Sequence, residues 1–305
     1  LELGLPLEVR VVERGEDGIE AFAFLGEIGG FVDHRAGVLT CGRNVGRMVA
    51  RRTGADKVAQ PPDRLQTAAN LSKDLRTRPP MPIGFRIRRN TDKAPADIIA
   101  RSKEIPVANV SDSMSRMTAG GPRLRPMHAS GQLSGPALTV KTRPGDNLML
   151  HKAIDMAEPG DVIVCDGGGD LTNSLMGELM LAQAIERGVA GFVLDGAIRD
   201  SDAFLERNLP VFAAGVSHRG PYKDGPGEIG YPIAVDGMVI HPGDVIIGDW
   251  DGVLCVPKAD AAAILEATEA KNAAEVEQMS AIAAGRLDRS WVDKALRDKG
   301  CSFED

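Results

Sequence analysis

An arginine and an aspartate stand side by side at Arg199 and Asp200, in the segment LDGAIRDSDAF, directly after a run typical of a buried strand. An arginine guanidinium binds a carboxylate through two parallel hydrogen bonds. One aspartate, completed by waters and substrate oxygens, is a common way to hold Mg²⁺. Both residues are therefore candidates for binding an anionic substrate beside a divalent cation. The alternative is that Asp200 only caps the helix predicted to follow and that Arg199 only pairs with it.

A second candidate is the glycine-rich segment DGGGDLTNSLMGELM at residues 166–180, which we expect to lead from a strand into a helix. The amides of a first helical turn have no partner within the helix, so they attract carboxylates or phosphates. The segment matches neither GxGxxG nor GxxxxGK[ST], which disfavours nucleotide binding, and its glycines alternatively serve only a tight turn. A right-handed return from this helix to the next strand would bring Arg199 close to residue 177.

Other polar residues are weaker candidates. His151 and His218 could lie near the mouth of such a site, although isolated histidines are more often structural and no HxH or HExxH spacing indicates zinc. Asp166 and Asp170 flank the glycines and are candidates for supporting roles around a metal.

Alternating helical and strand patterns from about residue 95 onward must position these residues. Apolar spacing and end signals predict helices at residues 94–105, from Ser111 or Asp112, at 148–157, from Thr172 or Asn173 to Gly188, and at 199–208, 259–285 and 290–300. Strand patterns occupy residues 131–148, 161–170, 189–196, 209–216, 231–240 and 244–257. The order favours a layered α/β fold with a mixed sheet, without a clean β-α-β alternation.

Composition narrows the function classes. The chain has 305 residues, a formal net charge of -7 and 4% aromatic residues, so we expect no nucleic-acid partner. Its four cysteines form no CxxC pair, which argues against a zinc site and a disulfide framework. No run of about 18 apolar residues and no secretory signal pattern is visible, so we expect a cytoplasmic protein without a membrane partner.

Residues 1–80 differ from the rest, since they contain a segment rich in arginine, polar residues and proline with little periodicity. We expect either a weakly ordered extension or a small helical or β appendage, in which IEAFAFLGEIGGFV forms a strand pair. The compact domain is predicted to span residues 81–305.

Between about residues 85 and 257 the chain resembles the RraA-like family, which includes class II 4-hydroxy-4-methyl-2-oxoglutarate aldolases and regulators of ribonuclease activity. The matching segments include SGPALTVKTRPGDNLMLHKAI, PGDVIVCDGGGD, GELMLAQAIERGVAGFVLDGAIRD and PGDVIIGDWDGVLCVP. The resemblance implies a layered mixed-sheet domain of swivelling β/β/α type with flanking helices. It also implies a homotrimer or hexamer whose active sites lie between neighbouring subunits.

The resemblance further implies roles for individual residues. Arg199 would bind the 2-oxo group of a small 2-oxo acid, and Asp200 would bind the divalent metal, Mg²⁺ or Mn²⁺. A four-residue stretch would hold the substrate carboxylate, chiefly through backbone amides: Gly177, Glu178, Leu179 and Met180.

The expected reaction is a retro-aldol cleavage of a 4-hydroxy-2-oxo diacid, such as 4-hydroxy-4-methyl-2-oxoglutarate, to pyruvate. A pyruvyl unit chelates the metal, which acts as a Lewis acid toward the enolate, while Arg199 stabilises charge on the same oxygen. Oxaloacetate decarboxylation passes through the same enolate. Glu178, or a metal-bound water that it orients, is the candidate for proton transfer. The alternatives are a non-catalytic regulator that binds an RNA-processing endonuclease, and a related sugar-acid lyase or decarboxylase.

Overall fold

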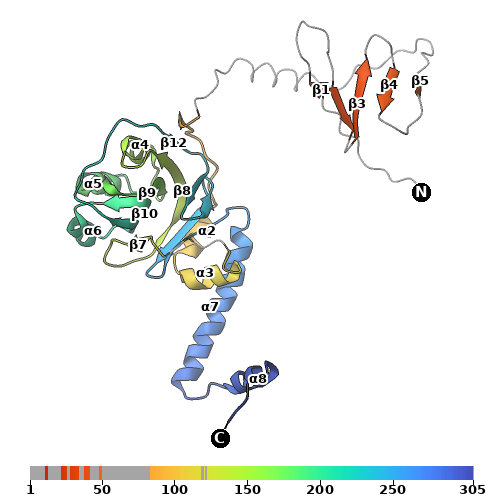
Figure 1. Cartoon of the computed structure of the whole chain (residues 1–305). Coiled ribbons are helices and arrows are strands. Elements are labelled where there is room, and N and C mark those ends of the chain that lie inside the picture. Colours follow the sequence, from red (N-terminus) through yellow and green to blue (C-terminus); the bar gives the residue numbers. More distant parts are fainter. Residues whose placement is uncertain are drawn as a thin grey trace. The chain divides into compact units, whose positions relative to one another are not determined.

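The computed structural model describes residues 83–117, 120 and 122–304, together with five short strands between residues 11 and 49. The chain divides into two compact units, Leu1–Arg78 and Pro79–Asp305 (Figure 1). Within the described residues, no helix is both long and apolar enough to cross a membrane.

The first unit contains an antiparallel sheet in which the strands pair in sequence order. Its strands are β1 (Val11–Val12), β2 (Phe22–Leu25), β3 (Ile28–Asp33), β4 (Val38–Cys41) and β5 (Met48–Val49). The β2–β3 pair overlaps the segment considered as a strand pair, residues 19–32, and extends one residue beyond it. The remainder of residues 1–80, on which the weakly ordered alternative rests, lies outside the described residues.

The second unit is built around parallel strands connected by helices. The parallel strands, in spatial order, are β8 (Leu133–Thr142), β9 (Val162–Met176), β10 (Gly191–Ile198) and β11 (Val211–Val216). The connecting helices are α4 (Leu148–Met156), α5 (Glu178–Glu186) and α6 (Ser201–Arg207). The β-α-β alternation is thus regular in this region, contrary to the sequence-based expectation.

Antiparallel strands complete the sheet on both sides of the parallel centre. They are β15 (Val245–Asp249), β16 (Gly252–Val256) and β12 (Gly227–Ile229) on the β8 side, and β7 (Arg125–Pro126) beside β11. β6 (Phe85–Ile87) pairs with β12, while β13 (Ile233–Val235) and β14 (Met238–Ile240) form a separate hairpin. This arrangement confirms the predicted mixed-sheet α/β fold class.

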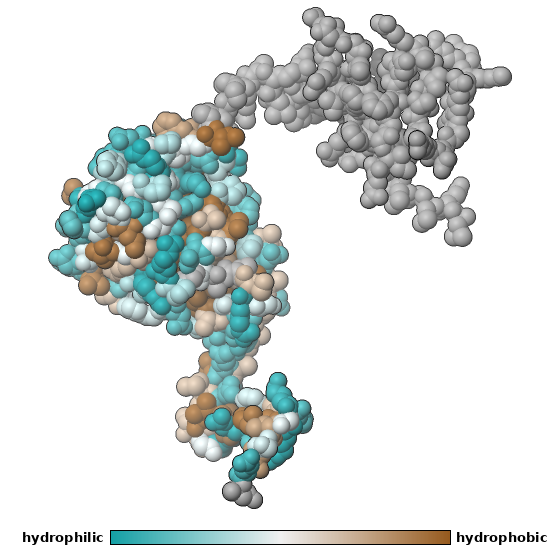
Figure 2. Space-filling view, viewed as in Figure 1, coloured by the Kyte–Doolittle hydropathy of each residue, from teal (hydrophilic) through white to brown (hydrophobic). Residues whose placement is uncertain are grey.

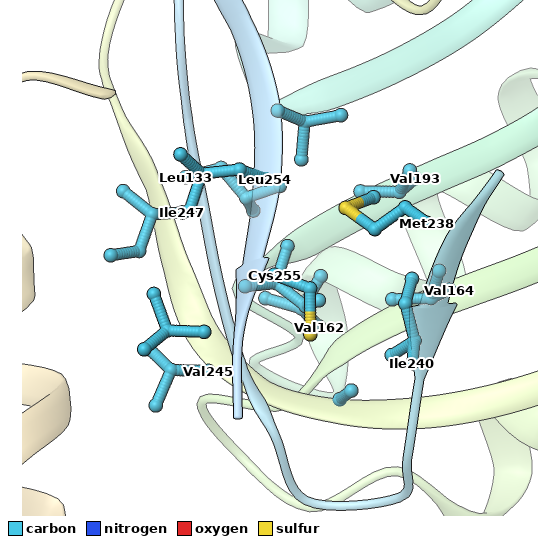
Figure 3. Close-up of a cluster of buried hydrophobic side chains, with 14 of the residues drawn as sticks. Leu133, Val162, Val164, Val193, Met238, Ile240, Val245, Ile247, Leu254 and Cys255 are labelled. Atoms are coloured by element: carbon cyan, nitrogen blue, oxygen red, sulfur yellow. The ribbon is translucent and has the colours of Figure 1, made fainter. Parts of the chain in front are cut away.

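The central strands are buried on both faces, because successive side chains of a strand point to opposite sides. In β9, Val162 and Val164 belong to one buried apolar cluster, whereas Ile163 and Cys165 belong to the other. Figure 3 shows the first cluster, where these valines meet side chains of the β13–β14 and β15–β16 hairpins. Fully apolar runs in the sequence therefore mark strands that are covered on both faces.

Helices cover both faces of the sheet (Figure 1). Side chains of α4 and α5 enter the second cluster, and α6 adds Phe204. The opposite face is covered by α2 (Ala96–Ser102), α3 (Val107–Ser113) and the first turns of α7 (Ala261–Ala283), which contribute Ile98, Val110 and Leu265. α8 (Ser290–Asp298) follows α7 and contains no buried residue.

Two predicted helix starts are wrong. α5 begins at Glu178 rather than near residue 172, because β9 continues past the glycines. Gly168 and Gly169 adopt positive φ angles of 68° and 69°, which glycine tolerates, and Ser174 then donates both its amide and its hydroxyl to the Arg219 carbonyl.

The other incorrect start belongs to α3. This helix begins at Val107, directly after Pro106, rather than at Ser111 or Asp112. Proline fixes φ near the helical value and has no backbone N–H that needs a partner. Pro106 therefore favours a helix start at this point, ahead of the cap predicted at Ser111 or Asp112. The predicted end of α5 is observed, since Gly188 follows the helix with a φ of 73°.

Candidate active site

The carboxyl ends of β9 and β10 meet beside the start of α5. The Arg199 amide donates to the Met176 carbonyl at 2.9 Å, and the Ser217 amide donates to the Ile198 carbonyl at 2.8 Å. Ligands of open α/β sheets usually bind outside the carboxyl ends of the parallel strands. The predicted proximity of residue 199 to residue 177 is present at this edge.

Asp200 joins the end of β10 to the start of α5. Its backbone is left-handed, with φ 56° and ψ 44°, and its side chain makes no capping hydrogen bond to α6. Instead, Oδ2 accepts a 3.0 Å hydrogen bond from the Glu178 amide. Among the described residues, no donor reaches Oδ1. The alternative in which Asp200 serves only as the cap of α6 is therefore wrong, and one carboxylate oxygen is available to a ligand.

Arg199 forms a long ion pair with this carboxylate, so the pairing that the alternative assigned to Arg199 is present. Its Nε is 3.7 Å from Asp200 Oδ2, and the two side chains are 43% and 44% exposed. In the described part of the chain, no other acidic group pairs with this guanidinium. A partly exposed pair at this distance contributes little to stability, so the side chain keeps donors for an anionic ligand.

Gly177 makes the close approach of these side chains sterically feasible. A Cβ atom at this position would lie 2.6 Å from Asp200 Oδ2 and 3.0 Å from Arg199 Nε. The backbone of Gly177 is extended, with φ −142° and ψ −172°, so its conformation does not require glycine. The absence of a side chain is what leaves room for the two charged groups.

The first turn of α5 presents unpaired backbone donors. Its first helical hydrogen bond runs from the Leu181 amide to the Gly177 carbonyl, so the preceding amides have no helical acceptor. The Glu178 amide is used by Asp200, whereas the amides of Leu179 and Met180 have no acceptor among the described residues. Unpaired amides at a helix start can bind a carboxylate, and these two lie beside Arg199.

A cleft of about 120 Å³ lies at Gly177, Arg199 and the first turn of α5, and Asp200 is not among its lining residues. It is lined by Asn147, His151, Ser174, Leu175, Met176, Gly177, Leu179, Met180, Arg199, Pro221 and Lys223. Asn147 is 2% exposed, and its Oδ1 has no hydrogen-bond partner, while its Nδ2 donates to the Leu175 carbonyl at 2.9 Å. A buried acceptor without a partner in a cleft wall is suited to a ligand donor or a water.

Sequence reasoning did not find Asn147 or Lys223. Both come from segments distant from residues 177–200. Asn147 lies in the family-like segment at residues 134–154, but neither its residue type nor its spacing singled it out there. His151, by contrast, was a weak candidate, and it lines the cleft one helical turn after Asn147. Burial lowers the pKa of His151 below its usual value, and the nearby charge of Lys223 acts in the same direction, against the opposing effect of Asp155.

Several predicted groups are directed elsewhere. The Glu178 carboxylate accepts a 2.8 Å hydrogen bond from Arg207, and Glu178 is absent from the cleft lining. Asp170 accepts the amides of Thr172 and Asn173, and Asp166 pairs with Lys141. His218 does not line the cleft. No group of three or more His, Cys, Asp or Glu residues in the described part of the chain could hold a metal ion by itself.

Residues 107–255 match the family model described as RraA-like, Aldolase/RraA. The candidate 4-hydroxy-4-methyl-2-oxoglutarate aldolase of Halalkalibacterium halodurans is 39% identical over 205 residues, which cover 67% of this chain and 98% of that protein. A candidate aldolase of the same name from Burkholderia mallei is 38% identical over 133 residues, covering 44% of this chain and 80% of the relative.

Solved structures show the same fold. An uncharacterised protein from Pseudomonas syringae pv. tomato superimposes with a TM-score of 0.58 at 25% identity, covering 64% of this chain and 96% of that chain. A Streptomyces coelicolor member of the RNase ES inhibitor RraA protein family gives a TM-score of 0.55 at 22% identity, covering 63% and 98% of the two chains.

Proposed function

The chain belongs to the RraA-like family, and from this premise we propose that it is a divalent-metal-dependent aldolase. Its substrates are 4-hydroxy-2-oxo diacids of the 4-hydroxy-4-methyl-2-oxoglutarate type, which it cleaves to pyruvate, and it also decarboxylates oxaloacetate. The 39% identity to a candidate aldolase over nearly the whole of that relative supports this class. The observation that carries the proposal is the convergence of Asp200, Arg199 and the first turn of α5, since Asp200 contacts the Glu178 amide and Arg199, and Arg199, Leu179 and Met180 line the cleft.

The cleft is suited to a substrate with two carboxylates. The amides of Leu179 and Met180 and the Arg199 guanidinium hold the 2-oxo acid end. Lys223 adds a second cation to the lining, and Asn147 adds an unpaired acceptor. We infer that Lys223 binds the distal carboxylate, and that Asn147 accepts a hydrogen bond from a substrate hydroxyl or from a water.

Asp200 is suited to anchoring the metal. Its side chain is 44% exposed and its Oδ1 has no donor among the described residues. Mg²⁺ and Mn²⁺ accept a single carboxylate when waters and substrate oxygens complete the coordination, which agrees with the absence of a larger ligand cluster in the described part of the chain. When bound, such a cation supplies Lewis-acid stabilisation of an enolate.

The chain's own residues orient the substrate and stabilise charge. Arg199 donates to the 2-oxo oxygen, on which negative charge develops as the carbon–carbon bond breaks. The Glu178 amide donates to Asp200 Oδ2 and so orients this carboxylate at the end of β10. A role for the Glu178 carboxylate in proton transfer stays a prediction, with its bond to Arg207 as the competing interaction.

We further propose a homotrimer or hexamer with active sites between subunits, formed by a domain spanning residues 81–305, with residues 1–80 as an appendage. Leu171 and Val216 are exposed, and Leu171 packs against Gly215, the residue before Val216. Val276, Met279 and Ile282 are exposed along the second half of α7, where Figure 2 shows apolar surface. Apolar surfaces of this kind commonly mark subunit contacts.

The test is a coupled assay of pyruvate release from 4-hydroxy-4-methyl-2-oxoglutarate and from oxaloacetate, with and without Mg²⁺. We expect metal-dependent turnover that is lost in Asp200→Ala and retained in Asp202→Ala, which removes an exposed carboxylate two residues away. Metal-independent turnover, or an unaffected Asp200→Ala variant, would contradict the proposal. No pyruvate from either compound, together with tight binding to an endonuclease, would favour the regulator alternative.

A further inference from the structure

Retro-aldol cleavage requires a base for the C4 hydroxyl of the substrate, whereas decarboxylation of oxaloacetate does not. The described titratable side chains that line the cleft are His151, Lys223 and Arg199. Lysine and arginine are cationic near neutral pH and are poor bases there. His151 is therefore the side chain in this lining that can accept a proton under ordinary conditions.

The position of His151 is fixed by the first turn of α4. Its amide donates to the Asn147 carbonyl at 3.0 Å, which places the two side chains on one face of the helix. Asn147 is in turn anchored to β9 through its bond to the Leu175 carbonyl. The His151 ring itself has no hydrogen-bond partner among the described residues, so a ring nitrogen is available to a ligand.

The cleft also orients the substrate relative to this ring. In the proposed function, the amides of Leu179 and Met180 and the Arg199 guanidinium hold the 2-oxo acid end on the α5 side of the cleft, which these residues line. The first turn of α4, with Lys223, supplies the other wall. A diacid held in this way would have its C4 hydroxyl and distal carboxylate on the side of the cleft that His151 and Lys223 line.

We propose that His151 is the general base that takes the proton of the C4 hydroxyl in aldol cleavage. This role rests on the proposed aldolase function and deepens it. As the imidazole accepts the proton, the C4–O bond becomes a carbonyl, the C3–C4 bond breaks, and its electron pair passes to the C2 oxygen as the pyruvate enolate. C3 then takes a proton from water, and the imidazolium returns its proton to solvent, so atoms and charge balance.

The charges around His151 suit this role. Burial together with the neighbouring Lys223 lowers the pKa of the ring, while Asp155 on α4 opposes the shift. Arg199, from the end of β10, is the other cation in the lining. A lowered pKa keeps the ring neutral, and hence basic, at neutral pH. Cleavage should lose rate as the pH falls through the lowered pKa of His151, which lies below the ordinary histidine value of about 6.5.

The test compares two reactions on His151→Gln at saturating Mg²⁺. Cleavage of 4-hydroxy-4-methyl-2-oxoglutarate should fall by about 100-fold or more, whereas oxaloacetate decarboxylation should stay within about threefold. The acid limb of the pH profile should be present for wild-type cleavage and absent for wild-type decarboxylation. His241→Gln, which changes a histidine outside the cleft lining, is the matched control and should retain both activities.

Each other outcome is decisive. An equal loss of both activities in His151→Gln would assign the residue a binding or structural role and overturn the proposal, as would full retention of cleavage. Wild-type protein that decarboxylates oxaloacetate but cleaves no 4-hydroxy-2-oxo diacid at any pH would also overturn it. Wild-type protein with neither activity would refute the aldolase function itself, and the role of His151 with it.

Discussion

The Glu178 amide and Asp200 Oδ2 are joined by a 3.0 Å hydrogen bond that connects the start of α5 to the end of β10. This bond uses one donor of the helix and one oxygen of the carboxylate. The amides of Leu179 and Met180 and the other carboxylate oxygen remain available at the same edge of the sheet. The geometry therefore combines an anion-binding turn with a cation anchor.

Gly177→Ala should impair activity without unfolding the protein. The added Cβ would lie 2.6 Å from Asp200 Oδ2 and 3.0 Å from Arg199 Nε, so the ends of both side chains must move. Displacement of this order costs about 10²-fold in rate when positioning matters. We expect a pyruvate-release rate reduced by about 10- to 100-fold with an unchanged melting temperature.

Gly220→Ala is the graded control for this substitution, because its Cβ would meet Arg199 Nη1 at an ordinary 3.4 Å. Its rate should stay within about threefold of wild type, since an ordinary contact requires little movement. Equal rates for wild type and Gly177→Ala would show that the approach of the two charged groups is irrelevant to turnover.

Arg199→Lys should reduce kcat by about 10²- to 10³-fold, because lysine cannot reproduce the planar donor fork that stabilises the developing oxygen charge. Steady-state kinetics at saturating Mg²⁺ would measure the change. Arg207→Lys is the matched control, since Arg207 pairs with the Glu178 carboxylate outside the cleft. Similar kcat values for Arg199→Lys and wild type would remove Arg199 from the chemistry.

Much of the fold is predictable from local patterns. The segments 148–157, 189–196 and 209–216 correspond to α4, β10 and β11, because apolar runs bounded by turn residues mark them clearly. The start of α5 is not predictable in this way. Thr172 and Asn173 are good local cap residues, yet tertiary hydrogen bonds from Ser174 to the Arg219 carbonyl keep the chain extended.

The sequence predicts only those residues of the candidate site that belong to one β-α-β unit. Gly177 and Arg199 each follow a strand of such a unit, β9 and β10, and the handedness of the crossover brings them together. Asn147 and Lys223 come from outside the unit and reach the cleft through the packing of α4 and of the loop before β12. Periodicity carries no signal for such contacts.

Asn147→Ala should affect stability and binding together. It removes the buried donor to the Leu175 carbonyl, and an unpaired buried carbonyl costs about 1–3 kcal/mol. Urea denaturation should show a free energy of unfolding lower by this amount, and KM for the diacid should rise. Lys223→Ala, which changes an exposed residue of the same cleft, should raise KM without a stability loss. A wild-type KM in both variants would exclude these residues from substrate binding.

Glu228→Gln should lower stability in a pH-dependent way. Burial of Glu228 acts to raise the pKa of its carboxyl, but hydrogen bonds from the Gly84 amide and Arg86 outweigh it, so the pKa lies below the ordinary 4.5. A carboxyl whose pKa is lowered by folding stabilises the folded state at pH values above the pKa that it has in the unfolded chain. This stabilisation is lost as the pH falls through the pKa of the folded protein. We expect a loss of about 1–2 kcal/mol at neutral pH, which disappears under strongly acidic conditions.

Denaturation of Glu228→Gln across this pH range, with the exposed Glu206→Gln as control, would measure the effect. A pH-independent difference between wild type and Glu228→Gln would exclude titration of this carboxyl as the cause.

The most direct measurement of the central claim is calorimetric binding of oxalate, which has the shape and charge of a pyruvate enolate, with and without Mg²⁺. Wild-type protein should bind oxalate in a Mg²⁺-dependent manner, and Asp200→Asn should lose this dependence while remaining folded. Oxalate binding that needs no metal, or that is unchanged in Asp200→Asn, would contradict an active site formed by Asp200, Arg199 and the α5 amides.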